Sequence, residues 1–163
     1  MRIRPATERD CPAIAEIWNP VIRDSEITFN SVEKTPAALA AMLRDKAAAD
    51  HPVLVAEAPD GGMLGFATYG QFRAGAGYAR TMEHTVILAP GARGRGAGRA
   101  LMTALEDHAR ARGVHSLWAG VSAANPAGVA FHAAIGFDRV AVLPEVGWKY
   151  GRLYDLVLMR KRL

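Results

Sequence analysis

The stretch Leu88-Ala89-Pro90-Gly91-Ala92-Arg93-Gly94-Arg95-Gly96-Ala97-Gly98-Arg99-Ala100-Leu101 is the most informative part of this 163-residue sequence. Within it a predicted strand ends, the backbone passes through four glycines, and an amphipathic helix begins. Free N–H groups at a helix start form an anion site with the helix dipole, and glycine permits the positive φ angles that direct several amides at one phosphate. The three arginines add charge-assisted donors. We therefore predict a phosphate-binding turn; the alternative is an ordinary helix-entry loop with solvated arginines.

The spacing within this turn indicates which phosphate ligand it binds. A Walker loop ends in Gly-Lys followed by Ser or Thr, whereas Gly98 is followed by Arg99 and Ala100. A dinucleotide fingerprint needs a third glycine at position 99 and an early β-α-β unit. The pattern Arg93-x-x-Gly96-x-Gly98 instead resembles the Gln/Arg-x-x-Gly-x-Gly/Ala signature of the GNAT acetyltransferase superfamily. This resemblance implies that the turn holds the pyrophosphate of acetyl-CoA through Arg93, Gly94, Arg95, Gly96, Ala97, Gly98 and Arg99.

Outward from this turn, hydrophobic periodicity predicts the chain order β-α-α-β-β-β-α-β-α-β-β. The expected strands cover residues 2–5, 53–56, 64–72, 82–88, 117–121, 137–142 and 153–159. The expected helices follow the capping box of Thr7 and Asp10, the Thr35-Pro36 start, the glycine-rich turn, and Asn125-Pro126. No repeat or composition break divides the chain. Residues 1–163 are therefore expected to form a single α/β domain, a mixed sheet with helices on both faces.

Composition restricts the class of protein further. Half of the residues are hydrophobic, no stretch reaches the roughly 20 apolar residues of a membrane helix, and no signal-peptide pattern follows Met1. The single cysteine, Cys11, cannot form an internal disulfide, which is typical of a reducing compartment. We therefore expect a cytoplasmic protein. The net charge of +4 suits nucleic acid, an anionic membrane surface or a nucleotide phosphate, and all three stay open on composition alone.

Further stretches resemble one subgroup of the superfamily, the phosphinothricin and methionine sulfoximine N-acetyltransferases, over nearly the full chain. They are Arg4-Pro5-Ala6-Thr7, Trp18-Asn19 with Ser25 and Thr28-Phe29, Phe72-Arg73 before Tyr78, Thr81-Met82-Glu83-His84-Thr85-Val86, Phe131-His132 with Gly136-Phe137, and Gly147-Trp148-Lys149-Tyr150-Gly151 before Asp155. The resemblance implies a GNAT fold with a mostly antiparallel sheet of about six to seven strands. It also implies acetyl-CoA as donor, the α-amine of a small amino-acid-like molecule as acceptor, and a homodimer whose C-terminal segment helps shape the neighbour's site.

The chemistry of acetyl transfer to an amine needs a base, because an amine is mostly protonated at neutral pH. The predicted base is Glu83, on the strand that leads into the glycine-rich turn; the alternative is an exposed strand carboxylate. Backbone N–H groups near Ile87 and Leu88 are the candidate donors to the carbonyl oxygen. Together with Val86, these residues are expected to border the acetyl-CoA site.

The second helix of the predicted site begins at Asn125 and carries His132. The resemblance implies that Asn125 contacts the pantetheine arm of acetyl-CoA, and the same side chain suits an N-cap before Pro126. His132 stands where many GNAT enzymes have the tyrosine that protonates the departing thiolate. It is therefore the candidate acid, and a buried structural histidine is the alternative.

The acceptor needs a cation for its oxyanion, and Arg73 is the best candidate because a guanidinium forms bidentate pairs with planar oxyanions. Phe29, Thr81 and Lys149 complete the expected acceptor site with Glu83. Phe29 would pack on the carbon chain, and Lys149 would reach a site across a dimer interface or else be a surface lysine in a loop. Some phosphinothricin enzymes have a second arginine at the place of Gly75, which favours a sulfone, a sulfoximine or another anionic amino acid here.

Other classes of function fit the sequence less well. The five histidines show no His-Glu-x-x-His spacing and there is no Cys-x-x-Cys pair, so we expect no metal. A GNAT enzyme acting on a protein N-terminus, a lysine or an antibiotic amine keeps the same fold and is the main alternative. A nucleic-acid-binding module would use the arginines of the turn, but it lacks the aromatic-rich basic surface expected for single strands. We therefore expect neither a nucleic-acid nor a membrane partner.

Overall fold

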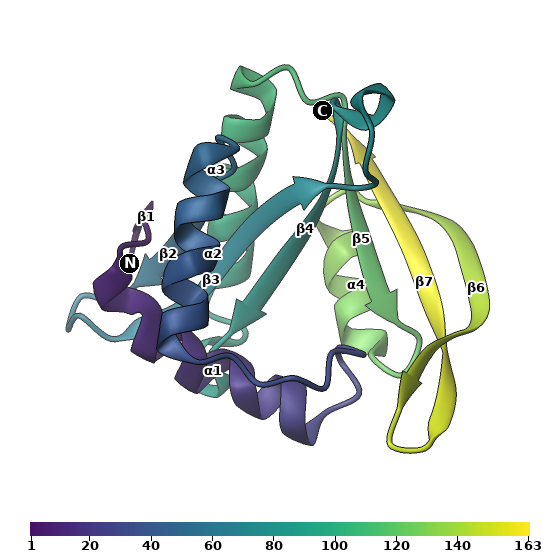
Figure 1. Ribbon diagram of the computed structural model, residues 1–163, viewed down its shortest axis with the longest axis horizontal. Coiled ribbons are helices and arrows are strands. Elements are labelled where there is room, and N and C mark those ends of the chain that lie inside the picture. The colour runs from purple at the N-terminus through teal and green to yellow at the C-terminus, as the bar shows by residue number, and fades with distance from the viewer.

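The computed structural model describes residues 1–163 and contains one seven-stranded sheet in the order β1-β2-β3-β4-β5-β7-β6 (Figure 1). The strands are β1 (Arg2–Pro5), β2 (Val53–Glu57), β3 (Met63–Gln71), β4 (Thr81–Leu88), β5 (Ser116–Ser122), β6 (Asp138–Lys149) and β7 (Arg152–Arg162). Every neighbouring pair is antiparallel except β4 and β5, which are parallel. The predicted mixed, mostly antiparallel sheet and the predicted order of elements are both confirmed.

Four α-helices cover the two faces of the sheet. They are α1 (Cys11–Asp24), α2 (Pro36–Ala48), α3 (Ala97–Ala111) and α4 (Pro126–Ala134), with short 3-10 turns η1 (Glu8–Asp10), η2 (Ala76–Tyr78) and η3 (Pro90–Ala92). Helices α1 and α2 lie on the near face in Figure 1, and α3 and α4 lie on the far face. Most of the near face over β5, β6 and β7 carries no helix.

The helix starts follow the sequence signals. The backbone N–H of Thr7 donates to the Asp10 carboxylate at 2.7 Å, which completes the predicted capping box at η1. The Arg4 guanidinium also binds this carboxylate and holds the pKa of Asp10 at about 2. Thr35 accepts from the N–H of Ala38 at 3.1 Å at the start of α2. These side chains satisfy N–H groups that a helix leaves without intrahelical partners.

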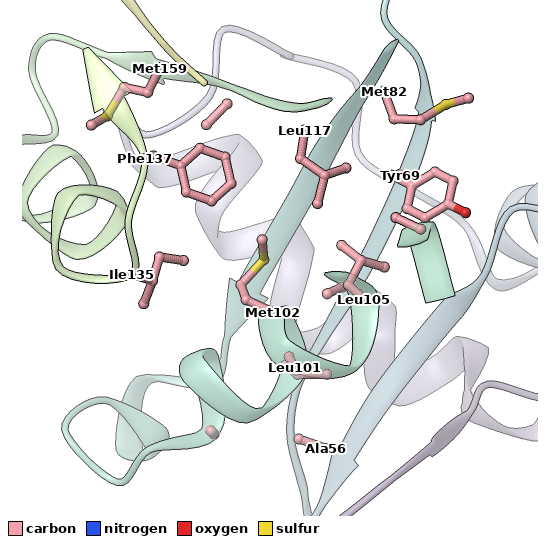
Figure 2. Packing of buried hydrophobic residues seen from close by; sticks show 14 of the residues in the cluster. Ala56, Tyr69, Met82, Leu101, Met102, Leu105, Leu117, Ile135, Phe137 and Met159 are labelled. Carbon is pink, nitrogen blue, oxygen red and sulfur yellow. The ribbon is translucent and has the colours of Figure 1, made fainter. Parts of the chain in front are cut away.

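The main core lies between the sheet and α3 (Figure 2). Leu101, Leu105 and Ala109 recur every four residues on α3, and all three are fully buried against β2, β3 and β4, as the periodicity predicts. A smaller cluster, which includes Ile14, Leu39 and Phe66, lies under α1 and α2 on the other face. The sheet is thus held from both sides, and the glycine-rich turn is fixed where β4 leaves the core and α3 enters it.

The last two strands are longer than the sequence predicts. The predicted strand at 137–142 ends before the Leu143-Pro144-Glu145-Val146-Gly147 segment, and the next predicted strand begins only at residue 153. In the structure this segment is an irregularity within edge strand β6, where the register to β7 shifts between Leu143 and Gly147. Proline is tolerated there because an edge strand and a bulge do not require its missing N–H. The chain reverses only at Tyr150 and Gly151, which have φ angles of 52° and 75°.

Candidate active site

A separation between the two parallel strands positions the site. β4 and β5 pair at only three positions, the last of which joins Glu83 to Trp118. Beyond that point β4 continues to Leu88 and β5 to Ser122 without pairing, and Figure 1 shows the two strands diverging. An opening between two strands in the middle of a sheet leaves main-chain groups of both strands without partners.

The backbone groups that face this opening follow from the β3–β4 ladder. Ala89 donates its N–H to Leu64, and Phe72 donates to Thr81, so the odd-numbered residues of β4 form the hydrogen-bonded pairs with β3. Hydrogen-bonded and non-hydrogen-bonded pairs alternate along an antiparallel ladder. The N–H of Ile87 therefore points toward β3, whereas the N–H groups of Val86 and Leu88 face the opening. The donors expected from the sequence are the N–H groups near Ile87 and Leu88. In the structure the N–H of Leu88 faces the opening and that of Ile87 does not, and the N–H of Val86 is a further donor.

A cleft with a volume of about 400 Å³ runs from this opening to the start of α3. The cleft is lined by most of the residues that are assigned to acetyl-CoA from the sequence, namely Val86, Ile87, Leu88, Arg93, Gly94, Gly96, Ala97, Gly98, Arg99 and Asn125. His132 borders the same cleft. Arg95 does not line it and is exposed.

The α3 end of the cleft has the features of a phosphate cradle. Gly94 and Gly96 adopt φ angles of 73° and 81°, which are left-handed conformations that favour glycine. The first backbone bond of α3 runs from Ala100 to Gly96, so the N–H groups of the residues between them have no intrahelical partner. Arg93 lines the same end of the cleft and takes part in no ion pair. These free donors and this cation fit the pyrophosphate of a coenzyme A molecule.

The opposite wall of the cleft is the first part of α4. Asn125 caps the helix, because its Oδ1 accepts from the N–H of Gly128 at 3.0 Å. A side chain at Gly128 would meet the Asn125 amide at 2.3 Å, so glycine is required for this approach. Further along α4, the Phe131 ring lies 3.2 Å from the point where a side chain at Gly98 would begin. The Phe131 ring thus packs closely against the start of α3, and both Gly98 and Phe131 line the cleft.

His132 is buried and forms a pair with His84 of β4. The two Nε2 atoms are 3.0 Å apart, and His132 Nδ1 lies 2.7 Å from the carbonyl oxygen of Gly128. A carbonyl only accepts, so Nδ1 of His132 carries the proton, and its Nε2 accepts from the N–H of His84. Desolvation lowers the pKa of both rings, which favours these neutral forms. In this arrangement neither nitrogen of His132 directs a free N–H into the cleft.

Glu83 lies at the point where the strands separate, on the sheet face that carries α1 and α2. One carboxylate oxygen sits 2.8 Å from the position that a side chain at Gly120 of β5 would occupy, so the carboxylate reaches over the opening. Although the residue is partly open to solvent, its carboxylate lies against β5, and no ion pair engages it. Desolvation by the surrounding protein raises the pKa of Glu83, which makes it a better proton acceptor at neutral pH than an ordinary carboxylate.

The residues expected to bind the acceptor fall on two sides of Glu83. Thr81 lies two residues before it on the same face, and Arg73 follows β3 nearby, with its guanidinium 5.6 Å from the Phe72 ring. Phe29 and Lys149 lie at the other side, where the loop after α1 meets the β6–β7 hairpin.

Lys149 is placed in strand β6 rather than in a loop. The residue is only 4% exposed, and its Nζ donates to the carbonyl oxygens of Ser25 and Thr28 at 2.6 and 2.8 Å. Desolvation lowers its pKa. Phe29 packs against Gly147 on the same hairpin. Lys149 thus fastens the loop after α1 within its own chain, and its expected reach into a neighbouring subunit stays a prediction.

Several residues of the site were not identified from the sequence. The loop and helix that Lys149 holds contribute Val21 and Ile27 to the cleft. Gly120 is an isolated glycine inside a strand, a signal of close approach that was available. No group of three or more His, Cys, Asp or Glu side chains has a metal-binding arrangement. None of the helices has both the length and the apolar character needed to cross a membrane.

Comparison with known proteins agrees with this geometry. The acetyltransferase (GNAT) family model matches residues 18–137. An L-amino acid N-acyltransferase, MnaT of Escherichia coli, is 37% identical over all of this chain and 94% of its own. An L-methionine sulfoximine/L-methionine sulfone acetyltransferase of Pseudomonas aeruginosa is 35% identical over 99% and 94% of the two chains. A phosphinothricin N-acetyltransferase of Streptomyces coelicolor is 34% identical over all of this chain and 96% of its own.

Solved structures of acetyltransferases have the same fold over the full length of this chain. A ribosomal-protein-alanine N-acetyltransferase from Brucella melitensis has a TM-score of 0.95 at 39% identity, with all of both chains covered. The yncA protein from Salmonella typhimurium, solved with its cofactor acetyl-CoA, has a TM-score of 0.95 at 36% identity over 100% of this chain and 94% of its own. The diverging strands, the glycine-rich cradle and these full-length matches lead to one conclusion: the chain belongs to the GNAT family of acetyltransferases.

Proposed function

We propose that the protein transfers the acetyl group of acetyl-CoA to the α-amine of a small amino-acid-like acceptor of the phosphinothricin, methionine sulfoximine or methionine sulfone type, by direct attack on the thioester. The observation that carries this proposal is the position of Glu83. Its unpaired carboxylate reaches over the opening between β4 and β5, while the residues suited to acetyl-CoA line the cleft that leads away from the same opening. Bound there, acetyl-CoA supplies an activated acyl group.

In this proposal Glu83 accepts a proton from the ammonium of the acceptor, directly or through a water molecule. Its raised pKa narrows the gap to that of the ammonium, and a base is more effective as that gap closes. The N–H groups of Val86 and Leu88, which face the opening, would stabilise the carbonyl oxygen as it gains negative charge. One such donor is typically worth about 3 kcal/mol of barrier.

In this proposal His132 forms part of the wall of the cleft and supplies no proton. The carbon–sulfur bond of the thioester breaks as the amide bond forms, and the departing coenzyme A thiolate takes up the second proton that the amine nitrogen loses. The N–H of His132 is held by Gly128 and its other ring nitrogen is occupied by His84. A role for His132 as the acid would require one of these two bonds to break.

Arg73 is the proposed clamp for an oxyanion of the acceptor. It is exposed, and no carboxylate pairs with it. We expect Arg73→Gln to raise the KM for the acceptor about 10-fold or more, because a charge-assisted hydrogen bond contributes roughly 1.5–3 kcal/mol. The KM for acetyl-CoA should stay unchanged. A thiol-release assay measures both constants, and an equal rise in both would contradict the assignment.

The same assay tests the class of acceptor. Methionine sulfone, methionine sulfoximine and phosphinothricin are to be compared with glutamate and with peptides that present an N-terminal alanine or a lysine. A protein N-terminus is the competing acceptor, since the Brucella melitensis structure is that of a ribosomal-protein-alanine N-acetyltransferase. Turnover confined to the peptides would reject the small-acceptor proposal while keeping the fold and acetyl-CoA.

We further propose that the protein is a cytosolic homodimer. A buried, unpaired Cys11 supports a reducing compartment. Exposed apolar side chains gather on the β6–β7 hairpin, namely Val140, Val142, Val146, Trp148 and Leu153. A second copy is the expected occupant, since exposed apolar patches of this kind mark interfaces. Light scattering should give twice the 17.5 kDa chain mass, and Trp148→Glu should lower it to the monomer while Val32→Glu, at another exposed valine, does not. A monomeric native protein would overturn this part.

A further inference from the structure

A second hollow lies on the same sheet face as Glu83, on the side away from the acetyl-CoA cleft. It has a volume of about 310 Å³, and its lining includes Phe72, Tyr78, Thr81, Trp118, Arg160 and Arg162. Registers place it next to the proposed base: Glu83 of β4 pairs with Trp118 of β5, and Trp118 pairs with Arg160 of β7. Residues paired in this way share a face, so Glu83, Trp118 and Arg160 form one row across three strands. With neighbouring strands about 4.8 Å apart, the row spans about 10 Å.

Two aromatic rings form the wall of this hollow. Phe72 and Trp118 stack with their centroids 5.0 Å apart and an interplanar angle of 29°. The indole N–H of Trp118 donates to the hydroxyl of Ser116 at 3.2 Å, which fixes the ring orientation. The guanidinium of Arg160 lies 5.9 Å from the Trp118 ring. The wall is therefore held in place before any ligand binds, and it suits the apolar stem of a side chain.

The charge of the hollow is positive and uncompensated. Neither Arg160 nor Arg162 takes part in an ion pair, whereas Arg4, Arg23, Arg44, Arg110, Arg112 and Arg152 all do. Asp138 lies opposite Arg160 in register, yet no ion pair joins them. Two guanidinium groups beside a fixed aromatic wall form a site for a planar oxyanion.

We infer that the acceptor carries a second anionic group at the far end of its side chain, and that Arg160 and Arg162 bind this group while the stem lies against the wall formed by Phe72 and Trp118. The inference rests on the proposed function, because it takes the reactive amine to lie at Glu83. The gap of about 10 Å between Glu83 and the backbone of Arg160 is one that an acidic side chain and an arginine side chain bridge together. Among the acceptors of the proposed function, this inference selects phosphinothricin, together with other acidic amino acids such as glutamate and α-aminoadipate, over methionine sulfone and methionine sulfoximine. It thereby departs from the expectation drawn from Gly75 in the sequence.

The test compares acceptors with and without the second charge on the purified full-length protein. Glutamate, α-aminoadipate and phosphinothricin are the anionic acceptors, and methionine sulfone and glutamine are the neutral ones. We expect Arg160→Gln to raise the KM for the anionic acceptors about 10- to 100-fold. It should leave the KM for neutral acceptors and for acetyl-CoA within about 2-fold, and Arg162→Gln should act in the same direction. Arg139→Gln is the matched control, since Arg139 is exposed on the opposite face of the neighbouring strand.

The contrary outcomes separate the inference from the proposed function. Turnover of methionine sulfone, with Arg160→Gln changing anionic and neutral acceptors alike, would overturn the inference and leave the function standing. A wild-type protein that prefers neutral acceptors would overturn it as well. If no amino acid of either class is acetylated although acetyl-CoA still binds, the proposed function fails and the inference fails with it. An unchanged KM for acetyl-CoA in Arg160→Gln verifies that the variant is folded.

Discussion

Glu83→Gln is expected to lower kcat about 100- to 1,000-fold with little change in the KM for acetyl-CoA. The substitution keeps the shape of the side chain and removes the proton acceptor, and a positioned general base contributes on this scale. Steady-state thiol release at saturating acetyl-CoA measures the loss. Glu16→Gln is the control, because Glu16 is an exposed carboxylate on α1 that takes part in no ion pair. A kcat within a few-fold of wild type would exclude Glu83 as the base.

The pH dependence should identify the same group. A base acts only when deprotonated, so kcat/KM should rise with pH through the pKa of Glu83, which desolvation places above the ordinary glutamate value. This rise of kcat/KM at the acidic end of the pH profile, the acid limb, should disappear in Glu83→Gln. Retention of the limb at the same position in the variant would assign it to another group.

The stability of the variant separates chemistry from folding. Because the pKa of Glu83 is raised in the folded state, its contribution to stability is present below the unfolded pKa and is lost as pH rises through the folded pKa. At pH 7 the ionised carboxylate therefore disfavours folding. We expect Glu83→Gln to have a Tm equal to or above that of wild type at pH 7. A marked fall in Tm would mean that the carboxylate has a structural partner.

Gly96→Ala is expected to raise the KM for acetyl-CoA about 5- to 30-fold. Gly96 has a φ of 81° at the N-cap of α3, and a left-handed conformation costs a residue with a side chain roughly 1–2 kcal/mol. Relief of that strain would turn the amides of the cradle away from the pyrophosphate. Steric conflict does not contribute, since no atom lies within 4 Å of the added methyl position.

Gly91→Ala is the matched control for this prediction. It lies in the same turn and has equal space around it, but its φ is not left-handed. Its KM for acetyl-CoA should match the wild type, and so should the KM for the acceptor in both variants. Equal effects of the two substitutions would show that the positive φ of Gly96 does not position the cradle.

The sequence alone determined the order of the elements, their caps and the acetyl-CoA turn, because these depend on interactions between residues close together in the chain. The capping box of Thr7, the buried row on α3 and the glycines of the turn are all local signals. The prediction was too short at the last hairpin, because it ended the strand at residue 142. In the structure β6 continues to Lys149, and the edge strand accommodates Pro144 through a shift in its register to β7.

Only the tertiary structure decided how the site is assembled across the sheet. Three features join residues from three strands. They are the end of β4–β5 pairing at Glu83, the position of its carboxylate over Gly120, and the row from Glu83 through Trp118 to Arg160. Strand alternation specifies which residues share a face of one strand, but register between strands is set by the packing of the whole sheet. The glycine-rich turn could therefore be predicted from the sequence, whereas the arrangement of the acceptor side depends on strand register and required the tertiary structure.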